Sequence, residues 1–299
     1  MKSVLITGCS SGFGMLAAVT LAKNGFRVFA SMRNLGKRGR LDEALAKAGA
    51  QAEVLALDVT SAESIAAAVR AVIERAGRVD ALVNNAGAAI GGFVEDVSLD
   101  EYRRLMDTNF FGTVALTKAV LPHMRRQRSG RIVNLSSIGG RVANPGLSAY
   151  VASKFAVEGF SESLALEADL FGVRVVLIEP GTFKTEIFES NKEMAAASRD
   201  PASPYFAVTQ ALEKKVDALV ARHGADPQQV ADVILKALTV PKPRLRYLVG
   251  SDAKLQAAIH TIGGFAVQNW VTGKLLGMSE IRPLLAERTD QASAQSATS

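Results

Sequence analysis

The sequence predicts an α/β protein with a doubly wound parallel sheet, and three observations support this prediction. Short runs rich in β-branched residues alternate with longer amphipathic or alanine-rich segments along the 299 residues. The short runs are almost continuously apolar, as strands that are covered on both faces must be. No linker interrupts the alternation before residue 183, so we expect one domain rather than two.

Seven short runs have the composition of strands, and they are Val4–Thr7, Arg27–Ser31, Glu53–Leu57, Ala81–Asn84, Arg131–Ser136, Val173–Glu179 and Arg246–Val249. Six longer segments between them have helical patterns, over residues 13–24, 41–48, 61–76, 98–126, 148–171 and 227–238. Alternation of this kind predicts right-handed crossovers and therefore a parallel sheet.

The alternation loosens after residue 183. We expect residues 184–226 to form a substrate lid made of helical pieces, because Asn, Pro and Gly interrupt the helical pattern there. Residues 252–277 predict a further helix, and we interpret 251–287 as a helical extension of the same domain. This extension docks on the domain or on a sister subunit; a role at a membrane surface is the alternative. The polar stretch 288–299 is expected to be a disordered tail.

Composition and charge exclude several classes of protein. The net charge of +6 comes from 35 Lys and Arg against 29 Asp and Glu. The basic clusters are short and carry few aromatic residues, which argues against nucleic-acid binding. One cysteine excludes an intrachain disulfide, and three histidines without a ligand pattern predict no metal site. Without a signal peptide or a run of about 18 apolar residues, we expect a cytoplasmic protein with no membrane span.

A glycine-rich turn follows the first expected strand. It reads Thr7-Gly8-Cys9-Ser10-Ser11-Gly12-Phe13-Gly14 and opens a helix, with the spacing GxxxGxG. Glycines allow a tight turn and let backbone N–H groups and a helix N-terminus approach a pyrophosphate. At the first strand of a βαβ unit, this turn predicts a dinucleotide site rather than a plain strand-to-helix connection.

The end of the second expected strand bears on which dinucleotide binds. An NAD site usually places a carboxylate there to bind the ribose hydroxyls. This chain has Arg33 instead, and a guanidinium pairs well with a 2′-phosphate, so NADP(H) is favoured and NAD(H) is the alternative. Asp58, followed by Val59 after the third strand, either reaches an adenine amino group or closes a turn.

Tyr150 and Lys154 form a YxxxK pattern, with Ser137 thirteen residues before the tyrosine. On a helix, residues four apart lie on the same face. A lysine ammonium beside the phenol would lower the tyrosine pKa, which is ordinarily about 10. The hydroxyl of Ser137 would hold a substrate oxygen beside the phenol. This trio suits proton transfer to or from a carbonyl or alcohol oxygen.

With the run Asn84-Asn85-Ala86-Gly87 after the fourth expected strand, the chain resembles the short-chain dehydrogenases/reductases over roughly residues 3–250. The resemblance implies a Rossmann-type sheet of seven parallel strands, a homodimer or homotetramer, and hydride transfer at a nicotinamide. Residues 1–250 would then form the dinucleotide-binding and catalytic domain. The turn Thr7–Gly14 and Arg33 are similar to the NADP(H)-using hydroxysteroid dehydrogenase and retinol/carbonyl reductase branches.

The resemblance also implies roles for individual residues. Tyr150 would be the general acid/base, and Lys154 would hold the nicotinamide ribose. Ser137, rather than its neighbour Ser136, would bind the reacting oxygen, and Asn109 would kink its helix and orient a water in a relay to Lys154. The residues implied to contact the cofactor are Gly8, Ser10, Ser11, Gly12, Phe13, Gly14, Arg33, Asp58, Val59, Asn85, Ala86, Gly87, Tyr150, Lys154, Pro180, Gly181, Phe183 and Thr185.

We expect an apolar substrate pocket, because the segments near its expected mouth carry few charges. The residues expected to line it are Gly91, Phe93, Gly139, Val142, Leu147, Ile187, Phe188, Tyr205 and Phe206. The sequence therefore predicts an NADP(H)-dependent oxidoreductase acting on an apolar, aromatic or steroid-like ketone, aldehyde or secondary alcohol. The alternative is a non-catalytic sensor or scaffold protein that binds NADP(H).

Overall fold

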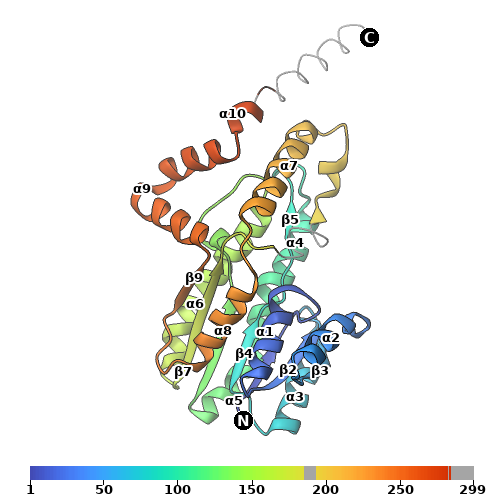
Figure 1. The fold of residues 1–299 in the computed structure, drawn as a ribbon, viewed down its shortest axis with the longest axis vertical. Helices are drawn as coiled ribbons and strands as arrows, with labels where there is room; N and C mark the ends of the chain where they lie inside the picture. The colour runs from blue at the N-terminus through green and yellow to red at the C-terminus, as the bar shows by residue number, and fades with distance from the viewer. Residues whose placement is uncertain (185–192, 282, 284–299) are drawn as a thin grey trace.

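Seven parallel strands form the central sheet, in the order β3-β2-β1-β4-β6-β7-β9 (Figure 1). The architecture is taken from a computed structural model that describes residues 1–184, 193–281 and 283. The strands are β1 (Ser3–Ile6), β2 (Arg27–Met32), β3 (Glu53–Ala56), β4 (Ala81–Asn84), β6 (Gly130–Leu135), β7 (Val173–Pro180) and β9 (Arg246–Val249). Each coincides with an expected strand to within one residue at either end. The predicted doubly wound parallel sheet is confirmed.

Helices cover both faces of the sheet, and each face has its own apolar core (Figure 1). One face packs against α1 (Gly12–Lys23), α2 (Gly39–Lys47) and α8 (Gln228–Thr239). The opposite face packs against α3 (Ala62–Ala76), α5 (Gly112–Gln127) and α6 (Ser148–Asp169). Burial from both sides explains why the strands are continuous apolar runs.

Local signals in the sequence determine where several helices begin and end. At the start of α3, the hydroxyl of Ser61 accepts a hydrogen bond from the backbone N–H of Ser64, and the helix stops at Gly77 in the left-handed conformation. Helix α4 (Leu99–Met106) starts with a reciprocal capping box between Ser98 and Glu101. Short 3₁₀ turns, η1 (Leu35–Lys37) and η3 (Ile138–Gly140), follow β2 and β6.

The segment expected as a helix over residues 98–126 is helical from Leu99 to Gln127, but it is not one regular α-helix. Instead, α4 and α5 are separated by a π-helical turn, η2 (Asp107–Phe111), which contains Asn109. A π-helical turn admits an extra residue and is frequent at functional sites. Here it carries the Asn109 side chain into the interior, where the residue is 1% exposed.

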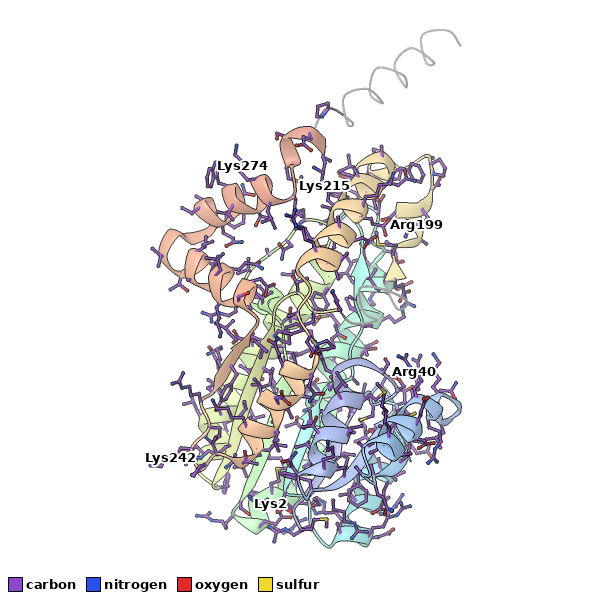
Figure 2. All side chains as sticks on the ribbon, in the orientation of Figure 1. Lys2, Arg40, Arg199, Lys215, Lys242 and Lys274 are labelled. Carbon is purple, nitrogen blue, oxygen red and sulfur yellow. The ribbon has the colours of Figure 1, made fainter. Side chains whose placement is uncertain are left out.

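Two very short strands that the sequence did not predict join the region after β7 to the rest of the domain. β5 (Ile90–Gly91) pairs in parallel with β8 (Glu193–Met194), and the backbone N–H of Ala195 donates to Gly91 O at 2.8 Å. The segment continues through η4 (Ala196–Arg199) to α7 (Phe206–His223). Arg199, labelled in Figure 2, forms an ion pair with Glu213 on α7. Residues 185–192 of the expected lid lie outside the described residues.

The long helix α9 (Ser251–Leu275) leaves the sheet after β9, and α10 (Met278–Ile281) turns back toward α7 (Figure 1). The helical path of α9 is interrupted at Gly264, which has a φ of 61° and a ψ of −166°. Lys215 on α7 and Glu280 on α10 form an ion pair of 2.6 Å, and Figure 2 labels Lys215 and, on α9, Lys274. The expected tail 288–299 lies outside the described residues. Among the described helices, none has the length and apolarity needed to span a bilayer.

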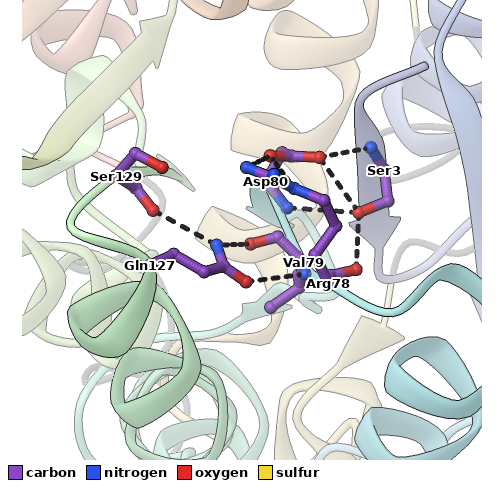
Figure 3. A network of polar contacts seen from close by, with 6 residues as sticks. All are labelled: Ser3, Arg78, Val79, Asp80, Gln127 and Ser129. Atoms are coloured by element: carbon purple, nitrogen blue, oxygen red, sulfur yellow. Dashed lines mark hydrogen bonds and ion pairs between the residues drawn. The ribbon is translucent and has the colours of Figure 1, made fainter.

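A polar network joins the amino ends of β1 and β4 (Figure 3). The backbone N–H of Ser3 donates to Asp80 Oδ2 at 2.8 Å, and the Ser3 hydroxyl donates to the carbonyl of Arg78 at 2.7 Å. The amide of Gln127, at the end of α5, bonds both the N–H and the C=O of Val79. These contacts satisfy the backbone at this edge, while the carboxyl ends of the parallel strands meet at the opposite edge.

Candidate active site

A cavity of about 450 Å³ lies at the carboxyl ends of the strands. It is centred where the strand order reverses, between β1 and β4, which is where ligands bind in open α/β sheets. Sixteen of the eighteen residues expected to contact a cofactor line it; Gly14 is buried behind it, and Thr185 lies outside the described residues. The lining also includes Met32, Lys37, Leu57, Ala88, Ile90, Arg104, Leu105, Thr108, Leu135, Ser136, Ser137 and Glu193.

The floor of the cavity is made by hydrogen bonds between the ends of β1 and β4. The hydroxyl of Thr7 accepts from the backbone N–H groups of Asn85 and Ala86, each at 2.9 Å. The side-chain amide of Asn85 donates back to the carbonyl of Thr7 at 2.8 Å. The two loops that follow these strands are thereby held against each other, with the glycine-rich turn above them.

The glycine-rich turn fits the diphosphate of a dinucleotide. A Cβ on Gly8 would lie 2.9 Å from the Asn85 amide nitrogen, and one on Gly14 would lie 2.4 Å from the carbonyl oxygen of Gly8. Gly12, by contrast, has open space above it. Ser11 is the N-cap of α1 but makes no side-chain capping bond, and the first turn of α1 carries no acidic residue. The first N–H groups of α1 therefore meet the cavity as hydrogen-bond donors for an anion.

Two cations lie at the far end of the cavity, after β2. Arg33 and Lys37 both line it, and Arg33 is exposed. Burial favours the neutral form of Asp58, but two hydrogen bonds from Thr60 and the charge of Arg33 outweigh burial and lower the Asp58 pKa. Asp58 Oδ1 accepts these bonds from the Thr60 N–H and hydroxyl, so its side chain closes a turn at the cavity wall.

The opposite wall comes from the turn after β7. The ring of Phe183 packs edge-on against Phe13, with centroids 5.5 Å apart. Asp252, in the first turn of α9, accepts a 2.7 Å bond from the N–H of Thr182. A Cβ on Gly181 would lie 2.2 Å from the Asp252 carboxylate, so a larger residue there would displace this carboxylate from its bond to Thr182. The sequence analysis did not identify Asp252, because nothing in the local pattern links it to a turn 70 residues earlier.

Tyr150 and Ser137 meet in the cavity. Ser137 follows β6, and its Oγ accepts the N–H of Gly139 at 3.0 Å. Burial raises the pKa of Tyr150, and the hydrogen bond from Ser137 opposes that rise. The lowered tyrosine pKa expected from the sequence is therefore wrong, because desolvation exceeds the stabilisation of the phenolate. The partner of the phenol is Ser137 rather than Ser136.

Lys154 is buried beneath the phenol. Its ammonium Nζ donates to the carbonyl of Leu135 at 2.8 Å and lies 5.7 Å from the centroid of the Tyr150 ring. Burial lowers the pKa of Lys154 to about 8, and the charge of Glu158 partly opposes this. A lysine in this state changes charge close to neutral pH.

Asn109 links three segments of the site. Its Nδ2 donates to the carbonyl of Ala88 and to the hydroxyl of Ser153, both at 2.9 Å. Its Oδ1 accepts the N–H of Ala88 at 2.8 Å, and Ser153 in turn donates to the carbonyl of Tyr150. The side chain thus connects the π-helical turn, the loop after β4 and the tyrosine-bearing turn of α6. A water-mediated link from Asn109 to Lys154 stays a prediction.

None of the seven described residues that were expected to form a substrate pocket lines this cavity. Val142 is fully buried and packs with Ile138, Ala253 and Ala257, so its apolar side chain belongs to a small core under α9. Phe93 stacks on Tyr205 at 4.8 Å between centroids. The others in the described residues are Gly91, in β5, Gly139, beside the Tyr150 ring, Leu147, at the start of α6, and Phe206, at the start of α7. Ile187 and Phe188 lie outside the described residues.

Comparison with known proteins agrees with this geometry. A model of the short chain dehydrogenase family matches residues 2–196. An uncharacterized oxidoreductase of Bacillus subtilis is 42% identical over 85% of this chain and 91% of its own length. The 3-ketodihydrosphingosine reductase of Bacteroides thetaiotaomicron is 39% identical over 83% of this chain and 87% of its own. Human 17-beta-hydroxysteroid dehydrogenase type 1 is 42% identical over 82% of this chain and 76% of its own length.

Solved structures extend the likeness to the fold. A short-chain dehydrogenase from Streptomyces avermitilis superposes with a TM-score of 0.75 and 34% identity, over 94% of this chain and 97% of that one. A relative from Burkholderia phymatum, in complex with NAD, has a TM-score of 0.76 at 26% identity, over 87% and 92%. A metagenomic short-chain oxidoreductase in complex with NADP has a TM-score of 0.65 at 27% identity, over 83% and 96%. The chain therefore belongs to the short-chain dehydrogenase family, whose members are nicotinamide-dependent oxidoreductases acting on CH–OH and C=O groups.

Proposed function

We propose that the protein is an NADP(H)-dependent oxidoreductase that interconverts a ketone or aldehyde and an alcohol on an apolar, aromatic or steroid-like substrate. The observation that supports this proposal most strongly is the meeting of Tyr150, Ser137 and Lys154 in the cavity that the glycine-rich turn also lines. One end of that cavity suits an anion, and the other end offers a phenol and a hydroxyl to a reacting oxygen.

In the proposed reaction, side chains of the protein transfer the proton and bind the substrate oxygen. A bound nicotinamide supplies or accepts the hydride. Tyr150 gives its proton to the oxygen of a ketone during reduction, and Ser137 donates a hydrogen bond to the same oxygen as negative charge develops on it. Because burial raises the pKa of Tyr150, the phenol is protonated at neutral pH and is ready to act as the acid.

The return of a proton to Tyr150 depends on Lys154. Its ammonium lies beneath the phenol ring, so it favours the phenolate that remains once the proton has left. The bond from Nζ to the Leu135 carbonyl keeps the charge at this place, and Asn109 positions the turn of α6 that carries Tyr150. Lys154 therefore lowers the free energy of the Tyr150 phenolate that forms when the proton has left.

The preference for NADP(H) is supported by charge. Arg33 and Lys37 supply positive charge after β2, where an NAD site would supply a carboxylate. Asp58, a carboxylate of the cavity wall that feels the charge of Arg33, is engaged by Thr60. A guanidinium at this place pairs with a 2′-phosphate through charge-assisted hydrogen bonds.

The substrate class is supported by the relatives rather than by the cavity alone. Two of them are named for 3-ketodihydrosphingosine and for a 17-beta-hydroxysteroid, which both consist mainly of hydrocarbon. At the cavity wall, Ile90 and Leu105 are apolar and almost fully buried, while Arg104 and Glu193 form an ion pair between α4 and β8.

A cofactor and substrate screen tests the proposal. Purified protein is incubated with NADPH or NADH and with a steroid ketone, a long-chain aliphatic ketone, an aromatic aldehyde or a ketose sugar, and loss of the reduced cofactor is followed by absorbance. We expect turnover with NADPH and at least one apolar carbonyl compound, and little with the sugar. Tight NADPH binding without turnover of any compound would contradict the proposal and indicate the non-catalytic sensor or scaffold.

A further inference from the structure

A buried cluster of charged side chains lies one helical turn beyond Lys154. On α6, Tyr150 comes one turn before Lys154 and Glu158 one turn after it. Glu158 is 6% exposed, and Glu179, near the end of β7, is fully buried. We call Glu158 and Glu179 the carboxyl pair. Neither of them lines the cavity, so the proposed mechanism does not use them.

The two carboxyls share one guanidinium. Arg246 Nε, on β9, lies 3.0 Å from Glu158 Oε2 and 3.0 Å from Glu179 Oε1. Only the contact with Glu158 has the geometry of a hydrogen bond, because Glu179 Oε1 has no hydrogen-bond partner. The same arginine also pairs with Glu162, which is more than half exposed. Arg141, after η3, reaches Glu179 Oε2 only at 3.5 Å.

One oxygen of the carboxyl pair is left without a hydrogen bond. Among the described residues, Glu179 Oε1 is one of six buried side-chain atoms that lack a partner. Ser136 and Glu158 lie together, since a Cβ on Gly140 would be 2.6 Å from Ser136 Oγ and 2.9 Å from Glu158 Cγ. Buried carboxylate oxygens without donors are costly, and a proton on one carboxyl supplies a donor.

We infer that Glu158 is a positioning residue for the proton transfer proposed above: it shares a proton with Glu179 and maintains the positive charge of Lys154. This inference deepens the proposed function and depends on it for its catalytic consequence. The electrostatic part of the inference, the control of the charge on Lys154, is a property of the chain itself and does not require turnover.

The proton balance of the cluster gives the direction of the effect. With one shared proton, the carboxyl pair carries a single negative charge. As the pH rises, that proton leaves to solvent and the pair carries two negative charges. The greater negative charge favours the ammonium form of Lys154, so the lysine retains its proton at a pH where burial alone would remove it.

The expected titration directions agree with this balance. Burial, and then the charge of Glu158, raise the pKa of Glu179 to about 7 against the opposing effect of Arg141 and Arg246. Burial also raises the pKa of Glu158, although a hydrogen bond from Ser136 and the charges of Arg246 and Arg141 oppose it. The charge of Glu158 raises the pKa of Lys154 against the effect of burial. The charged groups that act on Glu158 are Lys154 on α6, Arg141 after η3, Glu179 on β7 and Arg246 on β9, and Arg246 also pairs with Glu162.

The inference is tested by titrating Lys154 directly. The full chain is labelled with ¹³C-lysine, and the Cε resonance that Lys154→Arg removes is followed against pH by NMR. In Glu158→Gln, we expect the midpoint of Lys154 to move to lower pH by about one unit, a tenfold loss of proton affinity. Glu162→Gln is the matched control. Glu162 lies on the same helix and pairs with the same arginine as Glu158, but its carboxylate is exposed. The midpoint of Lys154 in Glu162→Gln should equal that of the wild type.

An unmoved midpoint in Glu158→Gln, or an equal shift in both variants, would overturn the inference. The wild-type chain provides a second test that needs no folded variant: with ¹³C-labelled glutamate, one carboxyl resonance should titrate close to pH 7. If every glutamate resonance titrated in the ordinary acid range, the shared proton would be refuted.

Kinetics then separate the inference from the proposed function. If the protein reduces an apolar ketone, the alkaline limb of its pH profile should move to lower pH in Glu158→Gln, return toward the wild-type position in Glu158→Asp and stay in place in Glu162→Gln. An alkaline limb that stayed in place in Glu158→Gln would overturn the catalytic part of the inference. If the protein turns over no substrate, the proposed function fails, but the NMR titration still decides whether Glu158 controls Lys154.

Discussion

The Nζ of Lys154 donates a 2.8 Å hydrogen bond to the carbonyl oxygen of Leu135, the last residue of β6. This contact joins the tyrosine-bearing helix α6 to the strand from which Ser137 follows two residues later. Helix and strand are thus held in register at the place where the phenol, the hydroxyl and the ammonium meet. A carbonyl of the sheet backbone is thus the hydrogen-bond partner that fixes the place of the lysine ammonium.

Replacement of Tyr150 by Phe removes the proton donor and leaves the ring. We expect kcat for reduction of an apolar ketone to fall by about 10²–10⁴-fold, the usual contribution of a positioned general acid. Affinity for NADPH, measured by fluorescence quenching, should change little, because the glycine-rich turn and the floor made by Thr7 and Asn85 are untouched. Turnover within a few-fold of the wild type would contradict the role of Tyr150.

Replacement of Arg33 by Asp reverses the charge where NADP(H) and NAD(H) differ. We expect the ratio of kcat/KM for NADPH to that for NADH to fall by about ten- to a hundredfold, since a hydrogen bond to a charged group is worth roughly 1.5–3 kcal/mol. Lys47→Asp, an equal charge change at an exposed position at the end of α2, is the control and should leave the ratio unchanged. Equal ratios in Arg33→Asp and the wild type would show that Arg33 does not select the cofactor.

The sequence predicted the seven strands and most of the cavity because both depend on local patterns. A strand buried on two faces is a continuous apolar run, and the glycine-rich turn, Arg33 and the Tyr150–Lys154 pair each follow an element at a recognisable spacing. The residues expected at a substrate pocket carry no comparable pattern. An apolar side chain such as Val142 has the same pattern whether it faces a ligand or a core.

Local patterns also could not predict contacts between distant parts of the chain. Asp252 closes the turn at Thr182 across 70 residues, and Arg246 reaches Glu158 across 88. Neither partner carries a signal in its own neighbourhood. The direction of the Tyr150 pKa was wrong for a related reason, since the degree of burial around a phenol depends on the whole fold and the pattern YxxxK reports only the neighbouring charge.

Gly14 tests the close approach within the glycine-rich turn. In Gly14→Ala, the new Cβ would lie 2.4 Å from the carbonyl oxygen of Gly8, so the backbone must move. We expect the free energy of unfolding to fall by about 1–3 kcal/mol, as for other overpacked sites, and NADPH binding to weaken. Gly159→Ala, in an exposed and unobstructed part of α6, should instead raise stability by about 0.5–1 kcal/mol. Denaturant unfolding of the two variants measures both effects, and a neutral Gly14→Ala would contradict the tight packing.

Cys9 is the only cysteine of the chain and is fully buried beneath the glycine-rich turn. Burial raises the pKa of its thiol to about 12, so the thiolate that reacts with disulfide reagents is almost absent at neutral pH. We expect no reaction with a chromogenic disulfide in the native protein and one equivalent in denaturant. Rapid modification of the folded protein would contradict the burial of Cys9.

The buried carboxyl of Glu179 should make the stability of the protein depend on pH in a definite direction. Its folded-state pKa is raised from 4.5 to about 7, so the folded protein binds the proton more tightly than the unfolded chain does. The resulting stabilisation is fully present below pH 4.5 and is lost as the pH rises to about 7. At roughly 1.36 kcal/mol per unit, the loss is about 3 kcal/mol at most.

In Glu179→Gln the titrating group is absent and the amide stays neutral at every pH. The free energy of unfolding of this variant relative to the wild type should therefore increase between pH 4.5 and pH 7 by up to about 3 kcal/mol. Urea unfolding at intervals across this range measures the difference, with Glu162→Gln as the control that should follow the wild type. Parallel curves for Glu179→Gln and the wild type would show that Glu179 is already ionised well below neutral pH, with its charge fully compensated by Arg141 and Arg246.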